Sequence, residues 1–186
     1  MFCAFLLSAF INLLFNDIDI TTKNMLFPGQ KLIEHRDTPF GNIAITKTGK
    51  QLNIFESGIL TASSDNIINN EETTHFAMVQ HPNPQKILII SNAVFGITDE
   101  ILKYHPNTIN IIEQNKYLIE IDKKYYKHPN NPRKQKSNIV NFIINDPKTF
   151  LVNHKNLYDV IILNTPSPLT AQFNRFFTLE FFQLLK

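Results

Sequence analysis

The second half of the chain alternates short apolar runs with amphipathic stretches. Residues 87–90 are all isoleucine or leucine, which is typical of a strand buried on both faces. Thr98, Asp99 and Glu100 then open a helical pattern, with acids where a helix N-terminus favours them. Similar β patterns recur at residues 108–113, 138–144 and 158–163, and helical patterns at 116–126, 149–152 and 178–186. Strands that alternate with helices predict a parallel sheet with right-handed crossover connections.

The first half shows shorter alternating segments that are separated by turns. Alternation of apolar and polar residues predicts strands at residues 31–35, 42–46, 51–55 and 59–62. Gly49 lies between the second and third of these segments, as in a β-hairpin. This part of the chain therefore predicts a small antiparallel sheet. Asn69 to Glu72 predict the start of a helix, which ends before the prolines of residues 81–84.

The N-terminal segment, residues 1–15, is apolar apart from Ser8 and Asn12, and residues 17–23 are predicted to form a polar linker. A bilayer span needs about 20 apolar residues, and the segment lacks the basic start of a secretory signal. Two alternatives remain: the end of a membrane segment that begins earlier, or a helix packed on the domain. We predict a cytoplasmic protein, with membrane association through residues 1–15 under the first alternative.

Composition fits one globular core and excludes some partners. The 186 residues are 43% hydrophobic and 18% charged, as in ordinary folded proteins. The net charge of +2 and the scattered lysines give no electrostatic footprint for nucleic acid. The single cysteine, Cys3, excludes an internal disulfide, and no metal site is predicted. We expect an apolar segment and linker (1–26), a small β domain (27–66) and an α/β domain (67–186).

The connection after the first strand of the α/β part is a place where such sheets bind nucleotides. Glycines normally fill this turn, because the backbone bends sharply and comes close to the ligand. Here residues 91–96 are Ser-Asn-Ala-Val-Phe-Gly, so only Gly96 is left. The sequence therefore predicts a ligand-binding turn that has lost most of its glycines.

Several segments together resemble the spermidine synthase (polyamine aminopropyltransferase) family, especially its bacterial members with a membrane domain ahead of the enzyme domain. The resemblance runs from about residue 27 to residue 186. Its segments are residues 37–43 (DTPFGNI), 71–72 (EE) with 81–84 (HPNP), 85–104, 158–162 (YDVII) and 177–182 (FTLEFF). The order and spacing of these segments, more than any one of them, are specific for the family.

The resemblance implies a fold and a reaction. The fold is a methyltransferase-like (Rossmann-like) parallel sheet preceded by a small antiparallel β domain. Members of the family transfer an aminopropyl group from decarboxylated S-adenosylmethionine to the amine of putrescine, in polyamine biosynthesis. The donor is a co-substrate, so no bound cofactor is expected. The reaction needs carboxylates that accept the proton of the amine, and a donor fixed in line with the nucleophile.

The resemblance also assigns substrate-binding roles. Gly96 belongs to the turn that faces the donor, where Val94 replaces an acid and Phe95 puts a bulky ring in place of bare backbone. Glu113, ending the second strand, stands where the acid of the family holds the ribose hydroxyls. Asp146, after the third strand, matches the residue that contacts the adenine. Acids at strand ends are often simply solvated, and for Glu113 and Asp146 both interpretations stay open.

The two catalytic aspartates of the family are missing. Their places after the fourth strand are taken by Asn164 and Ser167. Neither an amide nor a hydroxyl accepts the proton of an amine near neutral pH as a carboxylate does. In the gate segment, Glu72 is retained as a substrate-binding residue, whereas His75 is either a base or, as we favour, a structural histidine.

The resemblance implies about three more strands after the fourth, so we expect a C-terminally truncated sheet. The apolar strand at residues 160–163 would then lie at an open edge, and such an edge needs something that pairs with it or covers it. We expect a homodimer or a partner chain at this edge.

Two main hypotheses follow for the function. The first is a spermidine synthase-like transferase, acting on the nucleoside donor and a polyamine, with impaired catalysis. The second is a non-catalytic descendant, such as a degenerate fragment, a nucleoside-binding module or a partner-dependent piece. An S-adenosylmethionine methyltransferase is a third alternative, because a shared fold does not determine the chemistry.

Overall fold

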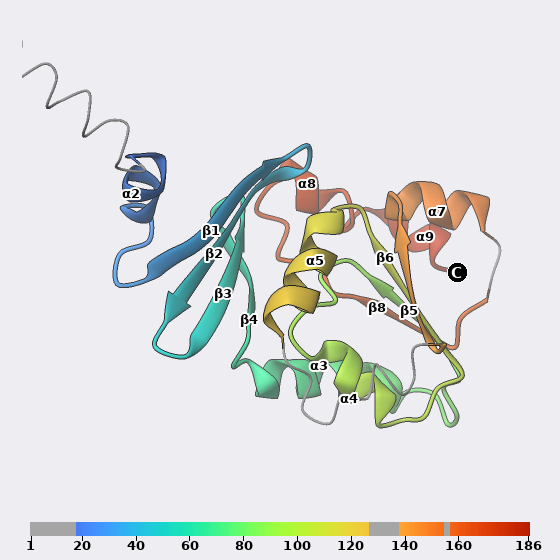
Figure 1. Cartoon of the computed structure of the whole chain (residues 1–186). Helices are drawn as coiled ribbons and strands as arrows, with labels where there is room; N and C mark the ends of the chain where they lie inside the picture. The colour runs from blue at the N-terminus through green and yellow to red at the C-terminus, as the bar shows by residue number, and fades with distance from the viewer. Residues whose placement is uncertain (1–17, 127–137, 155–156) are drawn as a thin grey trace, which may run out of the picture.

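The computed structural model describes residues 18–126, 138–154 and 157–186, and these residues form two four-stranded sheets (Figure 1). The first sheet is antiparallel, and its strands lie in chain order. They are β1 (Lys31–Thr38), β2 (Gly41–Thr48), β3 (Gln51–Glu56) and β4 (Ile59–Ser63). Thr48 pairs with Gln51, so Gly49 lies in a two-residue hairpin turn. The predicted small antiparallel sheet is confirmed.

The second sheet is parallel and has the strand order β7-β6-β5-β8. Its strands are β5 (Lys86–Ile90), β6 (Thr108–Glu113), β7 (Val140–Ile144) and β8 (Val160–Leu163). The predicted α/β fold with a parallel sheet is confirmed, although β7 and β8 begin two residues later than the pattern indicates. Since all four strands run in one direction, their carboxyl ends meet at one edge, where such sheets bind ligands.

Helices cover both faces of the parallel sheet (Figure 1). One face packs against α3 (Ile67–Met78) and α4 (Ile97–Leu102). The other packs against α7 (Pro147–Asn153), α9 (Leu179–Leu184) and Phe176, which follows α8 (Ala171–Asn174). Alternate residues of β5 point to opposite faces. Ile87 and Ile89 pack in the core on the side of α3 and α4, and Leu88 and Ile90 pack in the core on the side of α7 and α9. This explains the continuous apolar run of the strand.

Helix α5 (Lys116–Tyr125) joins the two sheets. Its residues Tyr117, Leu118 and Ile121 pack with Ile45 of β2 and Ile54 of β3 in one buried cluster. The small sheet is therefore held on the parallel sheet through a shared apolar layer. The domain boundary that we propose, at residue 66, coincides with Asn66, the N-cap position of α3.

The predicted linker and the predicted start of the first long helix are also wrong, and one short helix was not predicted. Residues expected to form a linker instead form α2 (Ile18–Asn24), which contacts β1 through the side chain of Asn24, an acceptor for Leu32 N at 2.6 Å. Helix α3 begins at Ile67 rather than at Asn69. The prediction missed Ile67 and Ile68 because both side chains are exposed and give no core-facing pattern. Helix α8 was missed because it has a single turn.

The predicted apolar segment, residues 1–15, lies outside the described residues. Within the ranges that the structure describes, no helix is long and apolar enough to cross a membrane.

The turn at residues 91–96 contains several residues in the left-handed region. The φ angle is +64° at Ser91, +49° at Asn92, +53° at Phe95 and +105° at Gly96. Such angles favour glycine, and a residue with a side chain costs roughly 1–2 kcal/mol more there. The turn therefore keeps a backbone suited to glycine at three positions that carry other residues.

Two buried carboxylates hold this turn in place. Glu113, which ends β6, accepts a hydrogen bond from Asn92 N at 2.9 Å through Oε2. Asp122 of α5 accepts one from Phe95 N at 2.9 Å through Oδ1. The two acids are only 2% and 1% exposed. Because buried N–H groups need partners and carboxylates are strong acceptors, these bonds offset the backbone strain.

Replacement of Asp122 by alanine should lower the free energy of unfolding by about 2 kcal/mol, because Phe95 N–H would be buried without this acceptor. The matched control is Glu120→Ala on the same helix, whose side chain is 52% exposed and whose loss should change stability by about 0.5 kcal/mol or less. Urea unfolding of both variants measures the difference. Equal losses would show that the turn does not depend on this carboxylate.

Candidate ligand-binding site

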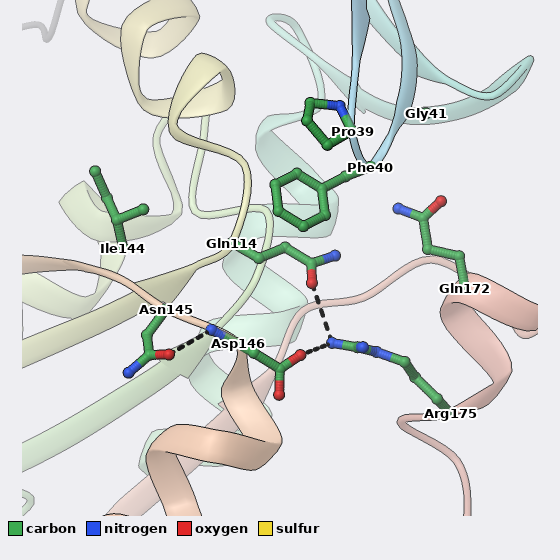
Figure 2. A pocket seen from close by; sticks show the side chains of 9 residues that line it. All are labelled: Pro39, Phe40, Gly41, Gln114, Ile144, Asn145, Asp146, Gln172 and Arg175. Atoms are coloured by element: carbon green, nitrogen blue, oxygen red, sulfur yellow. Dashed lines mark hydrogen bonds and ion pairs between the residues drawn. The ribbon is translucent and has the colours of Figure 1, made fainter.

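An open cavity of about 620 Å³, called the outer cavity below, lies at the carboxyl ends of β6 and β7. Figure 2 shows its nine lining residues, which come from four segments of the chain. Gln114 follows β6, Ile144 ends β7 and is followed by Asn145 and Asp146, and Gln172 and Arg175 come from α8 and the residues after it. The turn between β1 and β2 closes the remaining side with the ring of Phe40. The small sheet therefore forms part of the cavity wall.

Asp146 is the acidic group of this outer cavity. It is the N-cap residue of α7, where Oδ1 accepts a hydrogen bond from Thr149 N at 2.9 Å. Arg175 donates to Asp146 Oδ2 and also, at 3.0 Å, to Gln114 Oε1 (Figure 2). Partial burial opposes ionisation, but the bonds from Thr149 and Arg175 outweigh it and lower the pKa of Asp146. The residue is thus an ionised carboxylate at neutral pH.

Glu113 lies beside the outer cavity but below the surface. Its Oε1 accepts a hydrogen bond from Asn115 N at 2.9 Å, and Oε2 accepts bonds from Asn92 N at 2.9 Å and Ser91 Oγ at 3.4 Å. Burial raises the pKa of Glu113, and the backbone N–H groups oppose this rise. Glu113 ends a strand at the carboxyl edge of the parallel sheet, as the sequence predicts, and the structure adds its role in holding the turn. Its role in ligand binding stays a prediction.

A second, inner pocket of about 30 Å³ lies deeper, between β4, α3 and the turn at residues 91–96. Most of its polar groups are amides, from Asn66, Asn69, Asn70, Asn92 and Asn164, and no charged side chain is among the described residues that line it. At about the volume of one water molecule, the inner pocket fits a single small polar group.

Asn92 is the central residue of the inner pocket. Its Nδ2 donates to Thr61 O at 2.8 Å, and its backbone O accepts a hydrogen bond from Asn164 Nδ2 at 2.8 Å. Its Oδ1 is buried and has no hydrogen-bond partner among the residues that the structure describes. This oxygen has almost no accessible surface, so it is not open to the inner pocket.

Glu56 is a buried acid that the sequence analysis missed. It ends β3 on the face that also carries Ile54, it pairs across the strands with Ile43, and it is 7% exposed. Burial and the neighbouring charge of Glu113 raise the pKa of Glu56 to about 7, and a hydrogen bond with the Thr61 side chain opposes this rise. The sequence did contain a signal for this residue. Glu56 stands at a core-facing position of an alternating strand, where a charged residue is unusual.

The remaining predicted site residues lie at different distances from the two cavities. Gly96 is the N-cap residue of α4, and a Cβ there would come within 2.5 Å of Tyr126 Oη. Asn164 lines the inner pocket, whereas Ser167 and Glu72 are exposed and line neither cavity.

His75 belongs to a separate cluster between α3 and α4. Its Nδ1 lies 2.6 Å from Tyr104 Oη and its Nε2 lies 3.5 Å from a carboxylate oxygen of Glu100. These contacts agree with the structural interpretation of His75, and a role as a base is not tested by them. In the described part of the chain, no group of three or more acidic, histidine or cysteine side chains could hold a metal ion.

Comparison with known proteins gives a consistent result. Residues 66–186 match the sequence profile of the spermine/spermidine synthase domain. A polyamine aminopropyltransferase from Streptococcus uberis is 28% identical over 170 residues, which cover 89% of this chain and 55% of that protein. A polyamine aminopropyltransferase from Caldicellulosiruptor saccharolyticus is 31% identical over 142 residues, covering 74% of this chain and 50% of that protein.

Solved structures show the same likeness. A spermidine synthase in complex with the transition-state analogue AdoDATO superposes with a TM-score of 0.72 and 26% identity, covering 82% of this chain and 53% of that one. The spermidine synthase from Thermotoga maritima gives a TM-score of 0.69 and 27% identity, with 82% and 52% coverage. This chain thus spans about half the length of the relatives that it matches.

The raised pKa of Glu56 predicts a pH dependence of stability. The folded protein keeps a proton on Glu56 up to a pKa of about 7, whereas the ordinary value is 4.5. This proton contributes fully to the free energy of unfolding below pH 4.5. The contribution is lost as the pH rises through 7, and the loss is about 3 kcal/mol at most. Urea unfolding between pH 5 and pH 8.5 should show this decline.

The variant Glu56→Gln should lose most of the decline, since a neutral amide has no proton to release. The matched control, Glu34→Gln, removes an acid of the same sheet whose pKa is lowered to about 2 and which is therefore ionised throughout this range. A decline of the same size in Glu56→Gln and in the parent protein would refute the assignment.

Proposed function

Because the chain belongs to the spermine/spermidine synthase family, we propose that its outer cavity binds the nucleoside part of decarboxylated S-adenosylmethionine. The supporting observation is the position of the cavity, at the carboxyl ends of the parallel strands, with Asp146 and Gln114 exposing polar groups after two neighbouring strands. This is the edge at which open α/β sheets bind nucleotides.

Each wall of the outer cavity suits one part of a nucleoside. Asp146 and the adjacent Asn145 bring a carboxylate and an amide to the end of β7, where they could pair with the polar edge of an adenine. Phe40 is 39% exposed and offers a ring on the opposite wall for stacking. Glu113, one residue before Gln114, would hold the ribose hydroxyls after a small opening of the turn.

Aminopropyl transfer, in our proposal, is impaired in this chain. Asn164 uses its amide to bond Asn92 O, and Ser167 is exposed outside both cavities, so neither position supplies a carboxylate to accept a proton. The inner pocket, at about 30 Å³, is also too small to hold a diamine in this state. Glu72 remains a proposed contact for the polyamine, which requires movement of the ligand edge of α3.

We also propose a partner, either a second copy or another chain, at the edge of the parallel sheet. In the described residues, β8 pairs with β5 alone and is one of the two edge strands of the sheet. Edge strands rich in apolar residues are usually covered in stable proteins. Light scattering of the purified chain distinguishes a monomer from an assembly.

Titration calorimetry with methylthioadenosine tests nucleoside binding. Asp146→Asn should weaken binding by about ten-fold, because the substitution removes a charged acceptor, worth about 1.4 kcal/mol, but keeps a good N-cap residue for α7. The matched control is Glu120→Gln, an exposed acid on α5 that lies outside the cavity. The proposal is wrong if the folded parent chain shows no binding.

Restoring the acids tests the explanation for impaired transfer. The parent chain, incubated with decarboxylated S-adenosylmethionine and putrescine, should form spermidine at a rate at least about 100-fold below that of the Asn164→Asp, Ser167→Asp double variant, since a positioned base contributes about that much or more. Product formation followed by mass spectrometry measures both rates. A double variant that binds methylthioadenosine but gains no activity would contradict the explanation.

A further inference from the structure

Arg175 bridges two strand ends that border the outer cavity (Figure 2). Its Nη2 donates to Asp146 Oδ2, just after β7, and also, at 3.0 Å, to Gln114 Oε1, just after β6. Arg175 itself follows α8, so these bonds join three segments that are far apart in the sequence. We call this pair of hydrogen bonds the Arg175 bridge.

An aromatic contact also holds the guanidinium of Arg175. The guanidinium lies 4.7 Å from the centroid of the Phe176 ring, and Phe176 is buried in the core on the side of α7 and α9. A carboxylate partner and an aromatic face both stabilise a guanidinium. The side chains of Arg175 and Asp146 are 43% and 33% exposed, so solvent reaches the Arg175 bridge. The bridge is therefore a defined contact that a ligand can displace.

Arg175 also cancels the charge that a ligand would meet in the outer cavity. Among the described residues that line this cavity, Asp146 and Arg175 are the charged ones, and they carry opposite signs. A nucleoside without a phosphate has no anionic group, so it cannot replace Asp146 as the ionic partner of the guanidinium. A ligand of this class therefore gains no ion pair from Arg175.

The Arg175 bridge uses the polar groups that the proposed nucleoside needs. Asp146 Oδ1 accepts hydrogen bonds from the backbone N and the hydroxyl of Thr149, and Arg175 donates to Oδ2. These three bonds use most of the roughly four acceptor positions of a carboxylate. The guanidinium also lies between Asp146 and Gln114 (Figure 2). A nucleoside with its adenine at the end of β7 and its ribose at the end of β6 would lie across the same space.

We propose that Arg175 is a specificity-determining residue that limits the affinity of the outer cavity for uncharged nucleosides, because a nucleoside must displace its guanidinium from Asp146 and Gln114. The displaced side chain moves to solvent, and the freed acceptors bond to the ligand. This inference rests on the proposed function, which supplies the ligand class. The opposite role, in which Arg175 orients Asp146 for the ligand, predicts weaker binding when Arg175 is removed.

Calorimetric titration with methylthioadenosine, which is uncharged, tests this proposal. Arg175→Met keeps an unbranched apolar stem beside Phe176 but removes the charge and the donors, so the affinity should rise about five- to ten-fold. Arg175→Gln, a second neutral variant, should change the affinity in the same direction. The matched control is Arg36→Met, which should bind like the parent chain. Arg36 also lies over an aromatic ring, Tyr117 at 4.0 Å, and pairs with an acid, Glu120, but it is outside the cavity.

These titrations separate the inference from the proposed function. If the parent chain binds methylthioadenosine and the folded Arg175 variants bind it no more tightly, the role of Arg175 is overturned and the nucleoside site stands. If neither the folded parent chain nor the folded variants bind it, the nucleoside assignment is overturned and the role of Arg175 with it.

The dependence of affinity on salt is a readout that a merely structural role would not move. Salt screens an exposed ion pair, so the parent chain should bind methylthioadenosine about two-fold more tightly in about 0.5 M than in about 0.05 M sodium chloride. Arg175→Met has no such pair and should show no gain. The same gain in both chains would contradict displacement of the Arg175 bridge.

A double-mutant cycle distinguishes displacement from orientation. In the parent chain, Asp146→Asn removes an acceptor of the ligand but also weakens the Arg175 bridge, and the two effects oppose each other. In Arg175→Met the first effect remains alone, so Asp146→Asn should weaken methylthioadenosine binding by more there than in the parent chain. A smaller loss in Arg175→Met would show that Arg175 orients Asp146 for the ligand and would overturn the proposal.

Discussion

The structure depends on a buried polar constraint at the turn between β5 and α4. Three residues with side chains adopt left-handed angles there, and the strain is balanced by hydrogen bonds from Asn92 N and Phe95 N to the carboxylates of Glu113 and Asp122. These acids come from the next strand and the next helix, so the turn, β6 and α5 are positioned as one unit. Both cavities border this unit, and α5 in turn holds the small sheet that completes their walls.

Much of the fold was predictable from the periodicity of the sequence. Continuous apolar runs identified the buried parallel strands, and alternation identified the hairpin around Gly49, because these patterns reflect burial on two faces or on one. The prediction failed where tertiary contacts decide. Helix α2 is polar in sequence and contacts β1, and the start of α3 carries exposed isoleucines that give no core-facing signal.

The site was predictable only in its outline. Position at or after the end of a strand was enough to place Glu113 and Asp146 at the carboxyl edge of the sheet, because parallel strands end at one edge. Long-range partners were not predictable. Asp122 accepts a hydrogen bond from a backbone N–H 27 residues away, and Glu113 accepts one from a backbone N–H 21 residues away. The two acids that hold the turn lie below the surface, where no local motif reveals their partners.

The central claim is that the carboxyl edge of the parallel sheet is a nucleoside site. The most direct test is an amide NMR titration of the ¹⁵N-labelled chain with methylthioadenosine. The account predicts saturable shift changes at Gln114, Asn145 and Asp146, with Lys86 and Thr108 at the opposite ends of the strands unaffected. Changes confined to the opposite edge, or no changes in a folded chain at millimolar ligand, would contradict it.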